Sequence, residues 1–454
     1  MTEPSLDRLA LCFEGAVPAV IATAGADGTP NVTYLSRVHR VDDERIALSN
    51  QFFSKTARNL AENPRASVLL IDPVTYEQYR LSVAYERTER RGPVFERLRA
   101  DIDALASLEG MQDVFKLRAA DIYRVRHIEQ TPSALLHPDE EAPATEATAP
   151  PDPAAVAELA GRLSRAPDLD ALVTATVDGL AELLGYPNSM LLLLDEGGQR
   201  LYTIASHGYD AEGVGSEVLV GEDLVGMAAA RGTTLRVGNL RQMSKYSRSV
   251  RRSYERGGDP EVERDIPVPD LPDVQSRVAV PAMALGQLVG VLVVESREPV
   301  AFSASDEATL SVVASLVAGA VEAERLRDRT EEVPPVAATE AGAPSDSGPV
   351  TRVRFFEVDG STFLDGDYLI KGVAGRILWA LLGHHAREGR VDFTNREVRL
   401  DPSLDLPAFR DNFESRLILL KRRLDERSAP IGIEKTGRGR FRLAIEGRVE
   451  LERG

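Results

Sequence analysis

Residues that build disulfides and metal sites are scarce in this sequence. Cys12 is the single cysteine among 454 residues, which excludes a disulfide within the chain and any cysteine-rich zinc site. The six histidines include no His-x-x-x-His pair or comparable ligand spacing. We therefore predict that the protein holds no metal.

Long hydrophobic runs are missing as well. Apolar runs such as Met190–Leu194 are much shorter than the ~20 residues that a membrane-spanning helix needs. The opening residues, MTEPSLDR, do not have the basic and then apolar layout of a secretory signal. These features predict a cytoplasmic protein with no membrane contact.

The chain as a whole has fewer basic than acidic residues, but this balance differs along the sequence. The formal net charge is −17, which argues against a protein that coats nucleic acid. From Arg352 to the end, however, 20 Lys and Arg residues stand against 17 Asp and Glu residues. Only this C-terminal part is therefore expected to contact DNA.

Two segments have the composition of linkers. Residues 137–155 (HPDEEAPATEATAPPDPAA) and 331–350 (EEVPPVAATEAGAPSDSGPV) are rich in Pro, Ala, Glu and Thr and offer little to bury. They divide the chain into three parts of ordinary domain size. The predicted domains are 1–132, 154–330 and 351–454, joined by linkers at 133–153 and 331–350.

The first part is predicted to consist mostly of strands. Short β-rich runs, from AVIATA (19–24) to QYRLSVAYERTE (78–89), alternate with turn signals such as GADGTP, which favours an antiparallel barrel or meander. A helix at 93–105 and a closing strand near 122–128 complete this part.

A lysine and two hydroxyls stand where a short helix is expected to begin, in SNQFFSKTARNLAENP (49–64). One interpretation is a simple N-cap, in which Ser54 accepts a hydrogen bond from a free backbone N–H. The other is an anion site, because the free N–H groups and the positive dipole end of a helix start attract an anion. Lys55 would add a full charge to such a site, and Thr56 a hydroxyl donor.

The order of these segments over about residues 8–128 resembles the flavin-binding split barrels of the pyridoxamine 5′-phosphate oxidase-like family. In that family the strand after a Gly-x-Pro turn and a helix start like SKTARNL hold the phosphate of flavin mononucleotide (FMN). The resemblance implies a split β-barrel fold, the anion-site interpretation, and FMN, another flavin or a deazaflavin as cofactor. The implied cofactor-binding residues are Thr33, Ser36, Ser54, Lys55, Thr56, Gln78 and Arg80.

One departure from that family concerns its chemistry. The vitamin-converting oxidases end with a substrate-binding segment that has no counterpart here, so their reaction is not expected. Related barrels bind deazaflavin, haem or no cofactor. No general acid or base is evident in this part and we assign no catalytic residue, although a flavin carries hydride chemistry by itself.

The second part resembles GAF sensory domains, which are α/β sandwiches, over about residues 154–328. The matching features are the opening helix, the segment GEDLVGMAAARGTTLRVGNL (221–240), a predicted hairpin at 276–296 and the helix start FSASDEATL (302–310). Helical spacing from Leu169 to Leu184 and a further hairpin at 189–208 are also predicted. The bilin-attaching cysteine and the Asn-Lys-x-Asp pattern of cyclic-nucleotide binders are both missing. The predicted role is to bind an unknown small ligand, and a purely dimerising module is the alternative.

Two further features of the second part carry predictions. The basic stretch Lys245–Arg256 is either a lid over a pocket or an ordinary solvated loop. On the long helix that follows, apolar residues step by three and four and form a seam that is predicted to carry a homodimer toward the third part. The residues of this seam are Leu310, Val313, Val317 and Ala320.

The third part resembles the winged-helix effector domain of OmpR-type response regulators. DNFESRLILLKRRLDE matches the recognition helix, predicted at 408–427, and IGIEKTGRGRFRLAI (431–445) matches the wing hairpin. The side of the helix opposite its apolar core face is predicted to contact DNA. The predicted DNA-binding residues are Asn412, Ser415, Arg416, Arg422 and Arg423 on the helix, and Arg438 and Arg440 at the wing tip. A protein-binding winged helix is the alternative, because the charge of this part is nearly balanced.

Together these features predict a multidomain α+β protein that acts as a one-component transcription regulator. The barrel and the GAF domain would be its inputs and the winged helix its output. A homodimer, DNA and a small GAF ligand are the predicted partners. Two alternatives stay open, namely an FMN-dependent oxidoreductase with regulatory domains and a protein-binding signalling scaffold.

Overall fold

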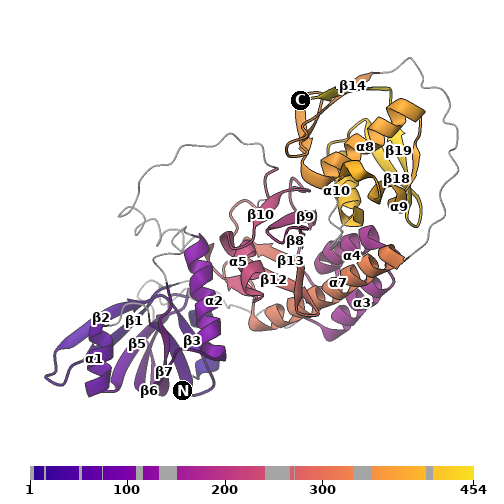
Figure 1. Ribbon diagram of the computed structural model, residues 1–454. Coiled ribbons are helices and arrows are strands. Elements are labelled where there is room, and N and C mark those ends of the chain that lie inside the picture. Colours follow the sequence, from indigo (N-terminus) through magenta and orange to yellow (C-terminus); the bar gives the residue numbers. More distant parts are fainter. Residues whose placement is uncertain are drawn as a thin grey trace.

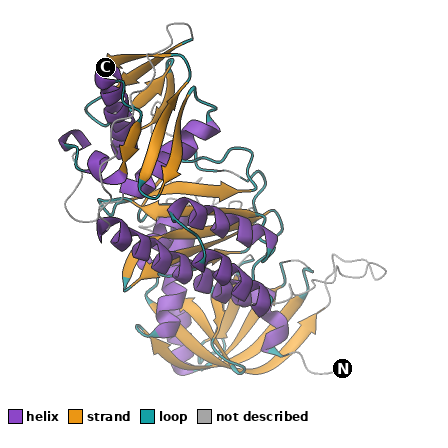
Figure 2. Cartoon of the chain, turned by 90° about the vertical axis from the view of Figure 1, so that its right-hand side faces the viewer, coloured by secondary structure: helices purple, strands orange, loops and turns teal. Residues whose placement is uncertain are grey.

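The computed structural model arranges the chain as three α+β units in a row (Figures 1 and 2). Figure 2 shows the N-terminal unit at the bottom, the central unit in the middle and the C-terminal unit at the top. The predicted linkers lie mostly outside the described residues, and the predicted domain boundaries stay predictions. The structure describes residues 5–14, 17–50, 54–73, 75–108, 116–131, 151–240, 266–269, 271–330, 349–404 and 413–454.

The N-terminal unit is a curled antiparallel sheet of seven strands in the order β2-β1-β5-β6-β7-β4-β3. Its inner face packs Ile21, Val68 and Leu81 into one core with Leu9, because every second side chain of a strand points inward. The predicted strand at 78–89 is confirmed. The elements are η1 Leu6–Glu14, β1 Ala19–Ala24, β2 Pro30–Leu35, β3 Val38–Arg40, β4 Arg45–Asn50, α1 Ser54–Glu62, β5 Arg65–Ile71, β6 Gln78–Glu89, α2 Pro93–Leu108 and β7 Ala119–Thr131.

Cys12 lies in this core and provides a first prediction. Its side chain is buried, and burial together with the charge of Asp72 raises the pKa of the thiol to about 12. Because the thiolate is the nucleophile, we expect thiol reagents at pH 8 to label the native protein about a hundredfold or more slower than the unfolded chain. Labelling rates measured with and without urea check this, and equal rates would contradict it.

The central unit is a six-stranded antiparallel sheet in the order β10-β9-β8-β13-β12-β11. Three helices cover one face and a short helix covers the other, so that the sheet is buried on both sides. Both predicted hairpins are confirmed, and the second turns at Gly286, where φ is +76°. The elements are α3 Pro153–Ser164, α4 Leu169–Glu182, β8 Asn188–Leu194, β9 Arg200–His207, β10 Glu217–Leu219, α5 Asp223–Arg231, β11 Leu235–Val237, β12 Ser276–Ala284, β13 Gln287–Ser296 and α7 Ala304–Thr330.

The long helix α7 buries the seam that was predicted to dimerise. Leu310, Val313 and Val317 are at most 1% exposed, and Ala320 packs against the same core. The prediction that this seam joins two copies is therefore wrong, since the apolar stripe faces the sheet of its own unit. The side of α7 that stays exposed carries Val312, Leu316 and Leu326.

By length and composition alone, α7 is also a candidate to cross a membrane. In the structure its apolar side packs on β12, β13, α3 and α4. The core of the central unit thus accounts for its composition. The cytoplasmic location stays a prediction.

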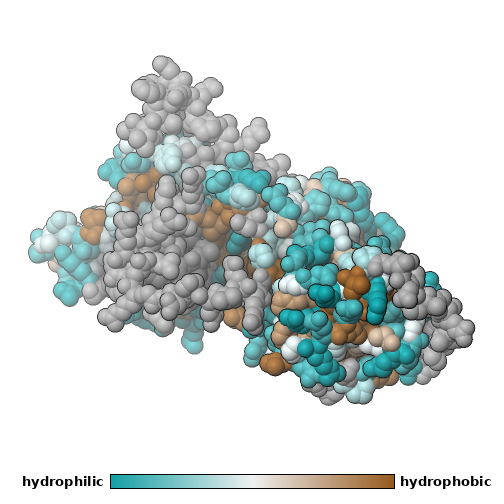
Figure 3. Space-filling view, turned by 90° about the horizontal axis from the view of Figure 1, so that it is seen from above, coloured by the Kyte–Doolittle hydropathy of each residue, from teal (hydrophilic) through white to brown (hydrophobic). Residues whose placement is uncertain are grey.

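The C-terminal unit combines two small sheets, β16-β15-β14-β20 and β17-β19-β18, around three helices. The predicted helix at 408–427 is described from Phe413 and ends at Glu426. From above, the surface of this unit, on the right of Figure 3, is mainly hydrophilic with small apolar patches. The elements are β14 Val350–Phe355, β15 Thr362–Leu364, β16 Asp367–Ile370, α8 Gly372–Glu388, β17 Asp392–Thr394, α9 Asn395–Arg399, η2 Pro402–Leu404, α10 Phe413–Glu426, β18 Ile431–Gly437, β19 Arg440–Ile445 and β20 Arg448–Arg453.

Candidate functional site

A polar network fixes the short helix α1 onto the sheet of the N-terminal unit. The side-chain amide of Asn31, on β2, donates to the hydroxyl of Thr56 over 3.0 Å, and that of Asn59 donates to Thr23 on β1 over 3.1 Å. Thr56 is only 3% exposed. The Thr56 hydroxyl thus has a partner within the fold. Its bond to Asn31, which lies two residues before Thr33, places the first turn of α1 beside β2.

Lys55 has a different environment from its neighbour. Its side chain is exposed, and no hydrogen bond or ion pair joins its ammonium to another described residue. Its charge is one of the weaker influences on Asp27, whose pKa is lowered mainly by hydrogen bonds from Thr29. Lys55 is therefore a cation at a helix start that is available to an anionic ligand. Ser54 is the first residue of the same helix, as predicted.

The other predicted cofactor residues lie elsewhere on the sheet. Arg80 pairs in register with Leu69 of β5, which pairs with Val20 of β1, so Arg80 shares the outer face with Tyr34 of β2. Its guanidinium forms an ion pair with Glu129 of β7. Gln78 lies two residues before Arg80, on the same face. Thr33, in contrast, lies on the inner face, in register with Ile21, and Ser36 follows the end of β2.

The seven predicted residues thus form two groups rather than one. Thr33, Ser36 and the start of α1 lie at one edge of the sheet, and Gln78 and Arg80 lie three strands away. At a strand spacing of about 4.8 Å, the two groups are roughly 14 Å apart.

A groove of about 850 Å³ is lined by residues of β1, β5, β6 and β7 and by Pro64, which precedes β5. Small side chains, including Ala22, Ser67 and Ser82, form its floor, and Arg65 and Arg126 contribute to its walls. Sequence reasoning missed this groove. The signal was present as alternating small residues on β1, β5 and β6, which leave an open surface on a sheet.

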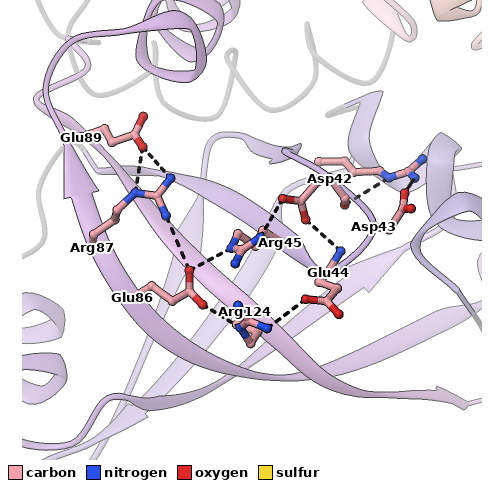
Figure 4. A network of polar contacts seen from close by, with 9 residues as sticks. Asp42, Asp43, Glu44, Arg45, Glu86, Arg87, Glu89 and Arg124 are labelled. Atoms are coloured by element: carbon pink, nitrogen blue, oxygen red, sulfur yellow. Dashed lines mark hydrogen bonds and ion pairs between the residues drawn. The ribbon is translucent and has the colours of Figure 1, made fainter.

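The outer rim of the sheet also carries a surface network of charges (Figure 4). Glu86 accepts hydrogen bonds from Arg45 and Arg124, and these arginines also pair with Asp42 and Glu44 respectively. The hydrogen bonds from the two arginines lower the pKa of Glu86. Because the network is exposed and screened by solvent, we assign it no binding role.

A second charged cluster joins the N-terminal unit to the central unit. The guanidinium of Arg97, on α2, donates to both carboxylate oxygens of Glu307 over 2.7 and 3.2 Å. Asp101, one turn along α2, lies between Arg97 and Arg37, with contacts of 3.5 and 3.2 Å. Arg37 directly follows Ser36, so the cluster connects the predicted cofactor strand to the first turn of α7.

The same cluster contains a carboxylate and a cation that sequence reasoning missed. Glu14, at the end of η1, forms an ion pair with Arg236 of β11, with 2.9 Å between the charged atoms, and both side chains are nearly buried. Burial raises the pKa of Glu14, although Arg236 acts in the opposite direction. Nothing in the local sequence marks these residues, because their partners lie more than 200 positions away.

Three of the predicted DNA-binding residues on α10, Ser415, Arg416 and Arg422, contact the central unit. Arg416 donates to Glu196 over 2.9 and 2.6 Å, and its guanidinium carbon lies 3.9 Å from the centre of the Tyr202 ring. The Tyr202 hydroxyl in turn donates to Ser415 over 3.0 Å. Ser415 and Arg416 are thus buried between two units in this structure.

The remaining predicted residues of the C-terminal unit differ in their surroundings. Arg422 binds Asp170 of α4, whereas Arg423 is buried in its own unit against the Leu369 carbonyl and Glu426. The assignment of Arg423 to the exposed face of the helix is therefore wrong, because its long side chain folds back onto β16. Asn412 lies outside the described residues.

Two of the predicted DNA-binding arginines lie at the turn of the β18–β19 hairpin, on either side of Gly439. Arg438 contacts Glu324 of α7 over 3.6 Å, and Arg440 lines a small groove beside α10. The basic stretch Lys245–Arg256 lies outside the described residues.

Two family models match this chain. Residues 6–126 match the model of pyridoxamine 5′-phosphate oxidase, and residues 168–321 match the model of the GAF domain. The chain contains a pyridoxamine phosphate oxidase-like domain and a GAF domain. The oxidase-like domain is the seven-stranded unit, and the GAF domain is the central sandwich. Both models end before β14, so the winged-helix interpretation of the C-terminal unit depends on its element order alone.

Solved structures resemble the oxidase-like and GAF domains at low identity. A GAF domain from an Acinetobacter phosphoenolpyruvate-protein phosphotransferase is 24% identical, with a TM-score of 0.31, and the match covers 38% of this chain and 93% of that one. An FMN-binding protein from Syntrophomonas wolfei subsp. wolfei is 17% identical, with a TM-score of 0.24 and coverage of 29% and 87%. An F420 reductase is 18% identical, with a TM-score of 0.20 and coverage of 27% and 94%. No curated protein matched the chain.

Proposed function

We propose that this protein is a flavin-responsive, one-component transcription regulator located in the cytoplasm. The oxidase-like domain would hold FMN, the GAF domain would bind a second small ligand, and the C-terminal unit would bind DNA. The observation that carries the proposal is that charged clusters join neighbouring units, with Arg97 bound to Glu307 and Arg416 bound to Glu196. A conformational change in an input domain could therefore reach α10 through direct contacts.

The residues of the oxidase-like domain fit an anionic, planar ligand. Lys55 offers a cation at a helix start with no partner among the described residues. The groove over β1, β5 and β6 has a floor of small side chains that leaves room for a flat ring system. A bound flavin would supply hydride or electron transfer. Lys55 and the start of α1 would hold its phosphate, and Gln78 and Arg80 would contact the rest of it.

The spacing of the two residue groups supports a homodimer. The two groups are three strands apart, and Thr33 lies on the opposite face of the sheet from Arg80, so one flavin would receive one of the two groups from a second copy. The outer face also exposes Val32 and Tyr34 on the edge strand β2, at 65% and 69%, and exposed apolar residues on an edge strand favour association. We therefore propose that two oxidase-like domains pair through this face.

The dimer is tested by its mass. Light scattering at micromolar concentration should return twice the 49.4 kDa of one chain. Tyr34→Asp should give monomers because it places a charge in the interface, whereas Val312→Asp, on the exposed side of α7, should leave the dimer intact. A wild-type mass near one chain would contradict the proposal, and dissociation by Val312→Asp alone would place the interface on α7.

The winged-helix interpretation is supported by the order of elements. Three strands, β14 to β16, are followed by α8, β17, α9, α10 and the β18–β19 hairpin, with β17 paired to β19, and the last strand β20 returns to pair with β14. In such a domain α10 would enter the major groove and the hairpin tip would contact the backbone. Arg416 and Arg422 would be the principal contacts of the helix.

DNA binding is tested by selection from random duplex DNA with the full-length protein. We expect an enriched motif with two half-sites, because a dimer presents two copies of α10. Arg416→Ala should weaken binding to this motif roughly ten- to hundredfold, in line with about 1–3 kcal/mol for a base-reading arginine. Arg438→Ala should weaken binding to all sequences alike and reduce the salt dependence. If no motif is enriched by the wild type, with or without FMN, or by a variant that lacks the Glu196 carboxylate bound to Arg416, the C-terminal unit does not read DNA.

An FMN-dependent oxidoreductase is the second candidate, because residues 6–126 match an oxidase family. An assay of catalytic turnover distinguishes the oxidoreductase from the transcription regulator. Oxidation of NAD(P)H by the purified protein with an added acceptor, without any DNA motif, would favour the enzyme.

A further inference from the structure

The face between the GAF domain and the C-terminal unit is built from complementary charges. The basic face of the C-terminal unit consists of Arg416, Lys421, Arg422, Lys435 and Arg438. The acidic face of the GAF domain consists of Asp168, Asp170, Glu196 and Glu324. Each cation of the basic face contacts at least one carboxylate of the acidic face.

The centre of this contact is the pair of Arg416 and Glu196. Their side chains are only 11% and 12% exposed, and the two parallel hydrogen bonds are bidentate. Burial opposes the charge of Glu196, but the hydrogen bonds and charge of Arg416 outweigh it and lower the pKa of this carboxyl group. Tyr202 stacks on the guanidinium from the GAF side.

A second part of the contact is at the start of α4. Asp170 binds Arg422 over 2.9 Å and Lys421 over 3.2 Å, and Thr174 accepts a further hydrogen bond from Arg422 over 2.6 Å. Asp168, the N-cap of α4, pairs with Lys435 of β18 over 2.7 Å. Figure 1 shows α10 lying beside α4.

Apolar side chains fill the space between these pairs. Leu419 of α10 and Ile370 of β16 are both 2% exposed, and both lie 3.9 Å from the position that a Cβ at Gly215 of the GAF domain would occupy. One continuous hydrophobic cluster includes residues of both units. The contact thus combines a desolvated centre with charged pairs, as in a specific interface.

The groups that hold the two units together are those that DNA would require. A carboxylate accepts two hydrogen bonds from an arginine in the same geometry as a phosphate does. While Glu196 and Asp170 occupy Arg416 and Arg422, neither arginine can reach a base or a phosphate, and the GAF sheet occupies the space of the duplex.

We propose that the GAF domain is an intramolecular competitor of DNA, and that the arrangement described here is the closed state that does not bind it. This inference rests on the proposed DNA-binding function of the C-terminal unit. An open state must break the pairs of the acidic and basic faces together. A ligand that activates the protein must bind the open state more tightly than the closed one.

The test uses the full-length chain with changes on the GAF side only. Glu196→Gln and Asp170→Asn, made together, remove two carboxylates of the acidic face and leave every residue of the basic face in place. Glu182→Gln and Asp178→Asn are the matched control, because they remove the same charge from α4 while their partners, Arg162 and His207, belong to the GAF domain.

Two measurements are made on each variant. Hydrogen exchange of the α10 amides reports opening without DNA, and fluorescence anisotropy with a pool of random-sequence duplex DNA reports binding. We expect the double variant to exchange faster in α10 and to bind DNA roughly ten- to hundredfold more tightly, because the apparent affinity scales with the open fraction. The control pair should change neither.

The outcomes separate the inference from the proposed function. Unchanged exchange in α10, or faster exchange with the DNA affinity of the wild type, would overturn the competitor role while leaving DNA binding intact. If α10 exchanges faster and no variant binds DNA at any salt concentration, the DNA-binding function fails and the inference fails with it.

Discussion

Replacing Lys55 with alanine is expected to weaken FMN binding roughly ten- to hundredfold. The change removes a charge-assisted hydrogen bond to the phosphate, worth about 1.5–3 kcal/mol. Lys55 is exposed and makes no hydrogen bond or ion pair with another described residue, so the folded structure should be unaffected. Titration of the apoprotein with FMN, followed by quenching of flavin fluorescence, gives the dissociation constant.

Two variants control this experiment. Arg58→Ala removes another exposed cation from α1, three residues further along, and should change the affinity little. Lys55→Arg keeps the charge and should recover most of the binding. An equal loss in Lys55→Ala and Arg58→Ala would mean that only the general charge of α1 matters, and no FMN binding by the wild type would refute the cofactor itself.

Asp101→Asn is expected to destabilise the oxidase-like domain by about 3 kcal/mol, since removing one partner of a buried ion pair leaves its counterions uncompensated. The carboxylate is 6% exposed and lies between Arg37 and Arg97. An amide of the same size still fills the space but cannot balance the charges of the nearly buried Arg37 and the partly buried Arg97. Cys12 provides the measurement, because its labelling in urea reports local opening of this domain.

The expected result is labelling of Cys12 about a hundredfold faster at moderate urea, where opening is pre-equilibrated. Glu96→Gln, on the same helix, is the control, because its partner Arg99 is also at the surface and the pair is exposed. The Glu14 carbonyl accepts a hydrogen bond from Arg37, and Glu307 binds Arg97. Similar rates in the wild type and in Asp101→Asn would show that these two contacts already compensate both arginines.

Local patterns predicted much of the fold. Strand β6 has the predicted bounds, and the hairpin at Gly286 is in the predicted place, because alternation and turn chemistry act over a few residues. Helical spacing was less decisive. It placed Leu310 and Val313 on one stripe of α7 correctly, but it could not show whether a second copy or the sheet of the same domain covers that stripe.

The candidate sites show the same limit. The helical spacing of α10 correctly predicted that Arg416 points away from the core of the C-terminal unit. It could not predict that Arg416 binds Glu196, which lies 220 residues earlier in the chain. For Arg423 the prediction was wrong, since a long flexible side chain at the edge of a helix can fold back and bind a backbone carbonyl. Contacts between domains depend on tertiary placement, which no local pattern encodes.

Helix α7 contacts a different neighbour near each of its ends. Glu307, in its first turn, holds Arg97 of the oxidase-like domain, and Glu324 contacts Arg438 at the turn of the β18–β19 hairpin. At 1.5 Å per residue these two carboxylates are about 25 Å apart along one continuous helix. If this helix moves as a rigid body, a rotation of about 5° about one end displaces the other end by about 2 Å. A small movement of α2 against the GAF domain would therefore separate Arg438 from Glu324 without any change inside the helix.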